Sequence, residues 1–436
     1  MQNFKKIKNI ENFKSYGERT LSETIRELLS ADIEIIYNPL TKLYTTYGIN
    51  IEDNPFRDSY KISDLEHILI CHCSKGYQES YLMAIVIKLK YVINNKIFHR
   101  LSQAVSNALE DSAITQFRNS IILMNENLIE RVISKSWKFG YNPYIIYNLI
   151  DKFNAIRSTT FEGKYLNTGL ILTNSFSEYK NENGNNRSGS LLKLKQQPYQ
   201  YPTDRIDNRF WKMADGKSSF YIASDIKPIN YMFFYDTTDK DYVDFMVLKG
   251  ALHRNDLLFR TFQGKELSII NGSNQEFIYQ QNVWRYRDHN AFKHLLKKNI
   301  GDDTSEAVLN SLIKYILILS KNDTSSILWI PIEEVKENSI KSSVSFSDDV
   351  INICNKAQEP LIMNLMTSDG AVQIDRQGRI VQYACIAVME DVEKNKAKGT
   401  GEQAAKNLAR NGIAIKISQD GTIKLFLNPE DNPIIF

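Results

Sequence analysis

One stretch in the last third of the chain constrains the fold more than any other. An apolar, helix-like run over residues 350–366 leads to Asp369-Gly370, a strand follows at 372–374, and a second strand returns at 380–389 after a turn. An Asp-Gly pair at the start of a buried hairpin places a carboxylate beside flexible backbone, where a ligand can come close. The stretch therefore predicts an α/β unit with a binding loop at Asp369 and Gly370.

A second loop of small residues follows this hairpin. Gly399-Thr400-Gly401 leads into a helix-like run over 403–410, and strands are predicted at 413–417 and 422–427, with Ser418 between them. The free backbone N–H groups at the start of a helix, together with the helix dipole, favour an anion. The second loop is therefore a candidate phosphate cradle.

These features together resemble one protein family. Asp369-Gly370-Ala371 matches an Asp-Gly-Ala motif, and Gly399-Thr400 followed by Ala404-Ala405 matches the frame of a Gly-Thr-Arg-His-Arg-Ala-Ala motif. Ser418 falls where the family has a phosphate-contacting serine after a strand, and a helix at 306–321 and a strand at 325–332 match the opening of the family's domain. The segment from about residue 303 to 436 thus resembles the diadenylate cyclase domain (DAC, or DisA-N).

The resemblance implies a fold, a reaction and a set of site residues. Such domains have a central mixed sheet flanked by helices, and two of them face each other in a homo-oligomer to join two ATP molecules into cyclic di-AMP. Asp369 would be the catalytic residue and would bind a divalent metal, Mg²⁺ or Mn²⁺. The nucleotide-binding residues carried over are Gly370, Ala371, Gly399, Thr400, Gly401 and Ser418.

The second motif departs from the family. Where the family has Arg-His-Arg, this chain has Gly401-Glu402-Gln403, so two cations are missing and a carboxylate has appeared. A carboxylate near phosphate oxygens repels them in a closed site. Nearby lysines are candidates to supply the lost charge: Lys394, Lys396, Lys398 and Lys406. Two functions stay open, a diadenylate cyclase and a catalytically inactive sensor that binds ATP or a cyclic dinucleotide.

In its layout the remainder of the chain resembles the sensor-like regions that precede diadenylate cyclase domains, and the whole is expected to be an α/β (α+β) multi-domain protein. Residues 1–160 are predicted to be mostly helical, with helices at 21–30, 79–94, 98–110, 115–136 and 143–153 and strands at 33–37, 43–46 and 65–73. Residues 161–300 predict an antiparallel sheet with a flexible loop near 179–190. The predicted strands there are 168–172, 219–223, 231–235, 245–248, 257–262, 266–270, 276–279 and 283–287, and a helix at 291–298 leads into the 301–436 domain.

Composition excludes some other classes. The chain has 436 residues and a net charge of +3, and acidic residues outnumber basic ones 19 to 14 from residue 301 onward, so a nucleic-acid-binding protein is not expected. Four cysteines do not make a disulfide framework, and no run approaches a membrane span, so the protein is expected to be cytoplasmic. Cys71-His72-Cys73 has too few partners for a structural zinc site. Trp284-Arg285-Tyr286-Arg287 favours a strand with inward aromatic residues over a stacking surface for bases.

Overall fold

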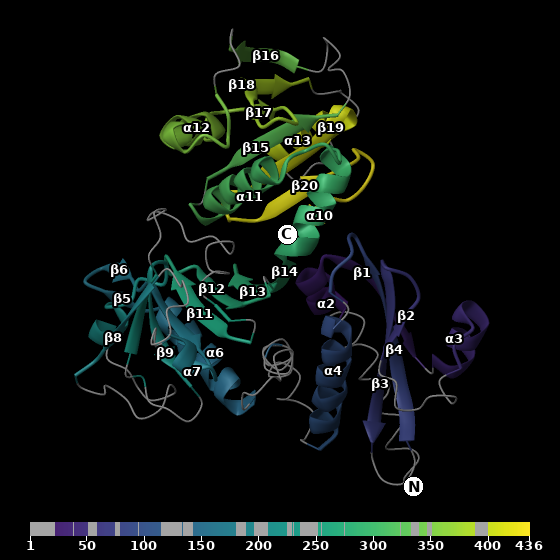
Figure 1. Ribbon diagram of the computed structural model, residues 1–436. Coiled ribbons are helices and arrows are strands. Elements are labelled where there is room, and N and C mark those ends of the chain that lie inside the picture. The colour runs from purple at the N-terminus through teal and green to yellow at the C-terminus, as the bar shows by residue number, and fades with distance from the viewer. Residues whose placement is uncertain are drawn as a thin grey trace. The chain divides into compact units, whose positions relative to one another are not determined.

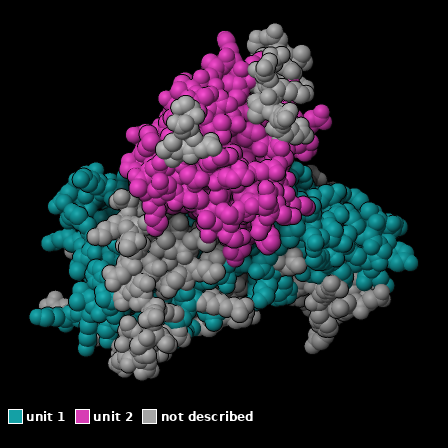
Figure 2. Space-filling view, turned by 45° about the horizontal axis from the view of Figure 1, so that its top comes forward, with its two compact units in different colours: residues 1–288 teal, residues 289–436 magenta. Residues whose placement is uncertain are grey.

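The computed structural model divides into two compact units, residues 1–288 and residues 289–436, coloured separately in Figure 2. The fold is α+β, built from several sheets and helices. The residues that the structure describes are 22–37, 39–50, 59–74, 79–94, 96–114, 133, 143–179, 189–195, 208–224, 229, 231–235, 252–253, 255–273, 275–322, 324–332, 340–346, 351–388 and 400–436.

The first sheet of the N-terminal unit has four antiparallel strands in the order β1-β4-β3-β2 (Figure 1). The strands are β1 (Ala31–Tyr37), β2 (Ser59–Lys61), β3 (Glu66–Ser74) and β4 (Glu79–Leu89), and the helices beside them are α2 (Ser22–Leu29), α3 (Pro39–Tyr47) and α4 (Lys96–Ile114). Helix α4 packs against β3, where Ser102 Oγ donates a hydrogen bond to the Ile70 carbonyl at 2.8 Å. Ring stacking of His67 on Phe98, with centroids 3.9 Å apart, joins the same two elements.

Two sequence predictions for this sheet were wrong. The predicted helix at 79–94 is the central strand β4, because a run of Ile85, Val86 and Ile87 suits a strand that pairs along both edges. The predicted strand at 43–46 is part of α3, which begins at Pro39, a residue well suited to a first helical turn. The region predicted to be mostly helical therefore also contains a four-stranded sheet. The predicted helix at 115–136 falls almost entirely outside the described residues.

The second sheet of this unit has eight strands in the order β14-β13-β12-β11-β7-β9-β10-β8. They are β7 (Thr168–Leu172), β8 (Gly189–Lys193), β9 (Ser219–Ala223), β10 (Tyr231–Tyr235), β11 (Leu257–Phe262), β12 (Glu266–Asn271), β13 (Gln275–Gln280) and β14 (Val283–Asp288), and a small hairpin, β5 (Thr160–Phe161) with β6 (Lys164–Tyr165), precedes them. Helix α6 (Pro143–Arg157) packs on β11, with Phe153 and Phe259 in contact. The short helices α7 (Phe176–Tyr179) and α8 (Asn208–Trp211) complete the unit.

The sequence predicted this sheet closely, with two differences. The neighbours β7 and β9 run parallel, whereas every strand pair was expected to be antiparallel. Strand β8 begins at Gly189, inside the segment 179–190 that was expected to be a flexible loop, because pairing with β10 recruits it to the sheet edge. Residues 180–188 and the predicted strand at 245–248 lie outside the described residues.

The C-terminal unit is a seven-stranded sheet with helices packed against it (Figure 1). Its strand order is β16-β18-β17-β15-β19-β20-β21, with one parallel pair, β15 and β17. The strands are β15 (Ser326–Pro331), β16 (Ile340–Ser345), β17 (Ala371–Ile374), β18 (Ile380–Ala387), β19 (Gly412–Ile417), β20 (Ile423–Phe426) and β21 (Ile434–Ile435). The helical elements are α10 (His289–Ile300), α11 (Glu306–Lys321), η3 (Lys356–Gln358), α12 (Glu359–Met366), α13 (Thr400–Leu408) and η5 (Ala409–Asn411).

One apolar cluster fixes α13 on a face of this sheet. Ile327 and Trp329 of β15, Ala414 of β19 and Phe426 of β20 pack against a stripe of small and apolar residues on the helix, Ala404, Ala405 and Leu408. Because side chains alternate along a strand, Leu328 and Ile330 face the other side. A central mixed sheet with helices was the predicted architecture of this segment, and the described elements agree with it.

One predicted helix in this unit is shorter than expected. The apolar run at 350–366 is helical from Glu359, because the Asn352 and Asn355 side chains accept hydrogen bonds from backbone N–H groups two residues on and so favour turns. The expected boundary near 300/301 falls at the end of α10, which belongs to the compact unit 289–436. Among the described residues no helix combines the length and the apolar character that crossing a membrane would require.

Candidate functional site

The loop that carries Asp369 is held between α12 and β17. The end of α12 is anchored by Ser326, whose hydroxyl donates to the Met366 carbonyl at 2.6 Å, and by Ser368, whose hydroxyl donates to the Leu365 carbonyl at 2.6 Å. Asp369 itself is exposed, and its Oδ1 accepts a hydrogen bond from the Gly370 N–H at 3.0 Å. The loop therefore presents this carboxylate to solvent from a backbone that is fixed on both sides.

Gly370 has a structural requirement for glycine. Its φ is +94°, and a Cβ at this position would lie 2.8 Å from the Ala384 carbonyl carbon and 2.9 Å from the Cys385 carbonyl oxygen. These are backbone atoms of β18 at an irregularity in its pairing with β17, where Ala384 has a φ of +50°. Ala371, the next residue, turns its methyl group into the core beneath α13. Of these two residues only the backbone remains for contact with a ligand.

Strand register brings the two motifs to one end of the sheet. Ile327 of β15 pairs with Ala371 on one side and with Lys416 on the other, and Lys416 pairs in turn with Lys424. Asp369 lies two residues before Ala371, and Ser418 lies two residues beyond Lys416 along an antiparallel strand. Both residues therefore lie at the same end of the sheet, separated sideways by about two strand spacings, roughly 10 Å.

Helix α13 begins above this end of the sheet. Thr400 and Gly401 form its first turn, and a Cβ on Gly401 would lie 3.0 Å from Lys416 Cε and 3.3 Å from Lys416 Nζ. The start of the helix thus lies directly over β19. Gly399, predicted to cradle phosphates with them, lies outside the described residues, as do Lys394, Lys396 and Lys398.

Ser418 closes the turn between β19 and β20. Its N–H donates to the Thr422 carbonyl at 3.0 Å, and its carbonyl accepts from the Gly421 N–H at 2.9 Å. Asp420 stabilises the same turn by accepting a hydrogen bond from the Thr422 N–H at 2.8 Å. The main chain at Ser418 is therefore committed to the turn, and the half-buried hydroxyl is the group that it can offer to a ligand.

Lys416 is a buried cation at the first turn of α13. Only 9% of the residue is exposed, and its ammonium donates to the Ser325 hydroxyl, a neutral partner. Burial lowers the pKa of Lys416 below its usual value; the Asp420 carboxylate acts in the opposite direction, and the Lys424 ammonium lowers the pKa further. No carboxylate among the described residues forms an ion pair with it, so the positive charge of Lys416 is available to an anion.

Glu402 is paired rather than free. Lys424 Nζ lies 2.6 Å from Glu402 Oε2, and both side chains are largely buried. The sequence predicted that a carboxylate here would repel phosphate oxygens, but the ion pair neutralises most of its charge. Counted together, Glu402, Lys416 and Lys424 carry one net positive charge beside the N-terminal end of α13.

Gln403, at the last of the three departing positions, lies on a different face of the helix from Gly401 because successive helical residues are about 100° apart. It is 8% exposed, and its Nε2 has no hydrogen-bond partner among the described residues. Gln403 therefore contributes no charge and is turned away from Lys416.

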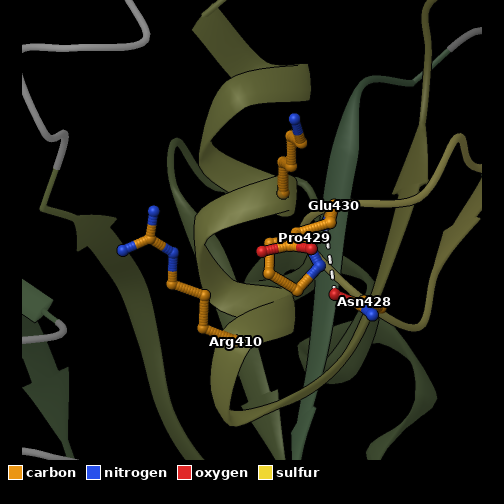
Figure 3. A pocket seen from close by; sticks show the side chains of 5 residues that line it. Arg410, Asn428, Pro429 and Glu430 are labelled. Atoms are coloured by element: carbon orange, nitrogen blue, oxygen red, sulfur yellow. Dashed lines mark hydrogen bonds between the residues drawn. The ribbon is translucent and has the colours of Figure 1, made fainter.

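A surface pocket of about 450 Å³ lies at the other end of α13. Figure 3 shows Asn428, Pro429 and Glu430 together beside the helix, with Glu430 N–H bonded to Asn428 Oδ1 at 3.1 Å. Lys406 and Arg410 complete the lining. Thr400 begins α13 and Arg410 lies in η5 just after its end, so the two are about 15 Å apart at the usual helical rise. The pocket is therefore distinct from the site at the first turn, and it is where Lys406, one of the predicted replacement cations, lies.

The residues of this site suit a metal ion that is bound mainly by the phosphates of a substrate and less by the protein. No group of three or more His, Cys, Asp or Glu side chains within the described part of the chain is placed to hold a metal ion. Mg²⁺ commonly keeps water and binds through one or two carboxylates plus substrate phosphates. Asp369 is exposed and uses Oδ1 to accept a hydrogen bond from its own loop, so its carboxylate suits such a role with a nucleoside triphosphate.

Sequence reasoning missed Lys416 and Lys424, the cations that the fold brings to this site. Both lie inside short apolar strands, where a lysine usually marks a solvent-facing position. The alternation of side chains along a strand could have located them. It places Lys416 on the same face of β19 as Ala414, and Lys424 on the same face of β20 as Phe426. These four positions belong to the face that α13 covers.

Comparisons with known proteins name neighbours without identifying a family. No protein-family model and no curated protein matches the chain. Among solved structures, a hypothetical membrane spanning protein from Bacillus cereus is similar over 29% of this chain and 62% of its own, with 20% identity and a TM-score of 0.24. A double mutant of DacA from Staphylococcus aureus is similar over 31% of this chain and 91% of its own, with 16% identity and a TM-score of 0.25. At this level of likeness we draw no function from either neighbour.

Proposed function

We propose that the C-terminal unit binds ATP with a divalent metal and condenses two ATP molecules into cyclic di-AMP. The observation that carries the proposal is that Asp369 and Ser418 share one end of the sheet through the register of β17, β15 and β19, and that the first turn of α13 lies against Lys416 of β19. The Asp-Gly-Ala motif and the small-residue motif that resemble the diadenylate cyclase family lie at this end. A carboxylate, a helix N-terminus and a hydroxyl are groups suited to a metal-bound triphosphate.

In this reaction the 3′-hydroxyl of each ATP attacks the α-phosphorus of the other, and two pyrophosphates leave. Asp369 would hold Mg²⁺ or Mn²⁺, and the bound ion would neutralise negative charge on the phosphates. The Thr400 and Gly401 N–H groups would bind phosphate oxygens, and Ser418 Oγ would donate to another. One domain presents one nucleotide, so the reaction requires two domains face to face in a homo-oligomer. The N-terminal unit would then act by setting how two copies meet.

The test is direct. The purified chain is incubated with ATP and Mn²⁺ or Mg²⁺, and cyclic di-AMP is sought by mass spectrometry. Metal-dependent product that disappears in Asp369→Asn supports the proposal, because amide oxygen is a poor replacement for a metal-binding carboxylate. A matched control is Asp431→Asn, which changes an exposed acidic residue in the segment after β20. Product that persists in Asp369→Asn, or is equally lost in Asp431→Asn, would contradict the assignment of Asp369.

A second function is favoured by the departure at 401–403. The chain lacks Arg-His-Arg, and one of the cations near the site, Lys424, already forms an ion pair with Glu402. In this alternative the C-terminal unit binds ATP or a cyclic dinucleotide without turnover, and this binding changes the state of the N-terminal unit. Nucleotide binding measured by calorimetry without any cyclic di-AMP after prolonged incubation would select this function over the first.

A further inference from the structure

The two lysines of β19 and β20 form an unusual pair. Lys416 and Lys424 are direct cross-strand neighbours, and like charges in that arrangement repel each other. Lys424 is compensated by Glu402 at 2.6 Å. Among the described residues Lys416 forms no ion pair: its ammonium donates to the neutral hydroxyl of Ser325, and the Asp420 carboxylate acts on it without forming an ion pair. A buried ammonium without a counter-ion is costly for a fold to keep. The cost is offset when an anion binds beside it.

The geometry around Lys416 indicates where such an anion would bind. Its Cε and Nζ lie 3.0 and 3.3 Å from the Cβ position of Gly401, in the first turn of α13. Backbone N–H groups at the start of a helix lack intrahelical acceptors, and the helix dipole adds positive potential there. The lysine ammonium therefore lies beside the first turn of α13, and both it and the N–H groups of that turn are hydrogen-bond donors.

Gly401 and Lys416 also depend on each other sterically. Any side chain at 401 would bring its Cβ against Lys416 Cε at 3.0 Å, closer than ordinary van der Waals contact. The arginine that the family motif has at this position would compete with the lysine for the same space. The chain therefore has one cation at this point, which comes from β19 instead of from α13.

We propose that Lys416 binds a phosphate group of the nucleotide at the first turn of α13, in place of the arginine that is absent at position 401. This inference rests on the proposed function for the identity of the ligand. Lys416 donates to a phosphate oxygen, and the Gly401 position stays without a side chain so that the lysine can reach it. Lys424 and Glu402 keep each other neutral beside it.

The first experiment measures binding of ATP, adenosine and inorganic tripolyphosphate to the full chain by calorimetry. Lys416→Met keeps the length and apolar stem of the side chain and removes its charge. A charge-assisted hydrogen bond to phosphate corresponds to about 10- to 100-fold in affinity. We expect Lys416→Met to weaken ATP and tripolyphosphate binding by that factor and to leave adenosine binding unchanged. Lys341→Met, an exposed lysine on β16, is the matched control and should bind all three ligands normally.

The second experiment separates binding from folding. Lys416→Ala opens the space beside Gly401, and Gly401→Arg added to it returns a cation from the helix. We expect the double variant to recover ATP affinity to within a few-fold of the original chain, whereas Lys416→Ala alone stays weak. A lysine that served only to fill the core would not be rescued by an arginine on another element. Far-UV circular dichroism and thermal melts show that each variant is folded.

The outcomes are distinguishable. Normal ATP and tripolyphosphate affinity in folded Lys416→Met overturns the role of Lys416 and leaves the proposed function standing. A wild-type chain that binds tripolyphosphate through Lys416 but does not bind ATP overturns the proposed function and keeps the anion site. A wild-type chain that binds neither ligand overturns both.

Discussion

Replacing Gly370 with alanine tests whether the Asp369 loop is built as described. A non-glycine residue at a φ of +94° costs about 1–2 kcal/mol in backbone strain. The new Cβ would also lie 2.8 Å from the Ala384 carbonyl carbon and 2.9 Å from the Cys385 carbonyl oxygen. Because these are backbone atoms in a paired strand, they cannot rotate away, and overpacking adds about 1–3 kcal/mol. We expect Gly370→Ala to lower the free energy of unfolding by about 2–5 kcal/mol.

The assay is urea denaturation followed by tryptophan fluorescence. Trp329 is fully buried and is the one tryptophan of residues 289–436, whereas Trp137, Trp211 and Trp284 lie in residues 1–288. A chain in which these three are replaced by phenylalanine therefore gives a fluorescence transition that reports on residues 289–436. With a slope of about 2 kcal/mol per molar urea, the midpoint should fall by about 1–2.5 M.

Gly163→Ala is the control for strain without collision; because Gly163 lies in residues 1–288, its cost is read from the transition of Trp211 and Trp284 in a chain that keeps these tryptophans. Gly163 has a φ of +75°, and no atom lies within 4 Å of its Cβ position. We expect this variant to cost about 1–2 kcal/mol, the strain alone. If Gly370→Ala costs no more than Gly163→Ala, the close packing of the loop on β18 is wrong, and with it the argument that fixes Asp369.

Three further predictions concern single side chains. Asp369→Asn should abolish metal-dependent formation of cyclic di-AMP. Because the side chain is exposed, the same substitution should change the free energy of unfolding by less than about 0.5 kcal/mol. A large loss of stability in urea would show a structural role instead. Burial lowers the pKa of His67, so the unfolded chain binds the proton more readily, and the free energy of unfolding should fall as the pH drops through the usual histidine range. His67→Phe retains a ring stacked on Phe98, and its stability should depend less on pH between 7.5 and 5.5. Equal slopes for the two proteins would refute this. Burial raises the pKa of Cys385 to about 11, so its thiol should resist a disulfide reagent at pH 8 until the chain is unfolded; rapid labelling of the native protein at Cys385 would count against its burial.

Local sequence pattern was sufficient to locate several elements, including strands whose partners lie far away along the chain. Helix α11 was predicted at its observed bounds from the resemblance to the family's domain, and in the structure Ser305 caps its first turn. Strands β7, β9, β10 and β11 were likewise predicted residue for residue from short β-branched and aromatic runs between turn signals. The segment 79–89 failed because an unbroken apolar run suits a buried helix or a central strand equally, and pairing with β1 and β3 decides between them.

The sequence by itself determined that Asp369 and Gly370 form a loop between a helix and a strand, and that a helix follows the small residues at 399–401. It predicted this helix at 403–410, whereas α13 begins at Thr400 and ends at Leu408. It could not place Lys416 of β19 against Gly401, because the two residues meet through the packing of α13 on the sheet. It also could not show that Glu402 is neutralised by Lys424, a residue of another strand. The periodicity of a sequence indicates on which face of its helix or strand a residue lies. The net charge at one end of a sheet depends instead on the register between strands that are distant in sequence.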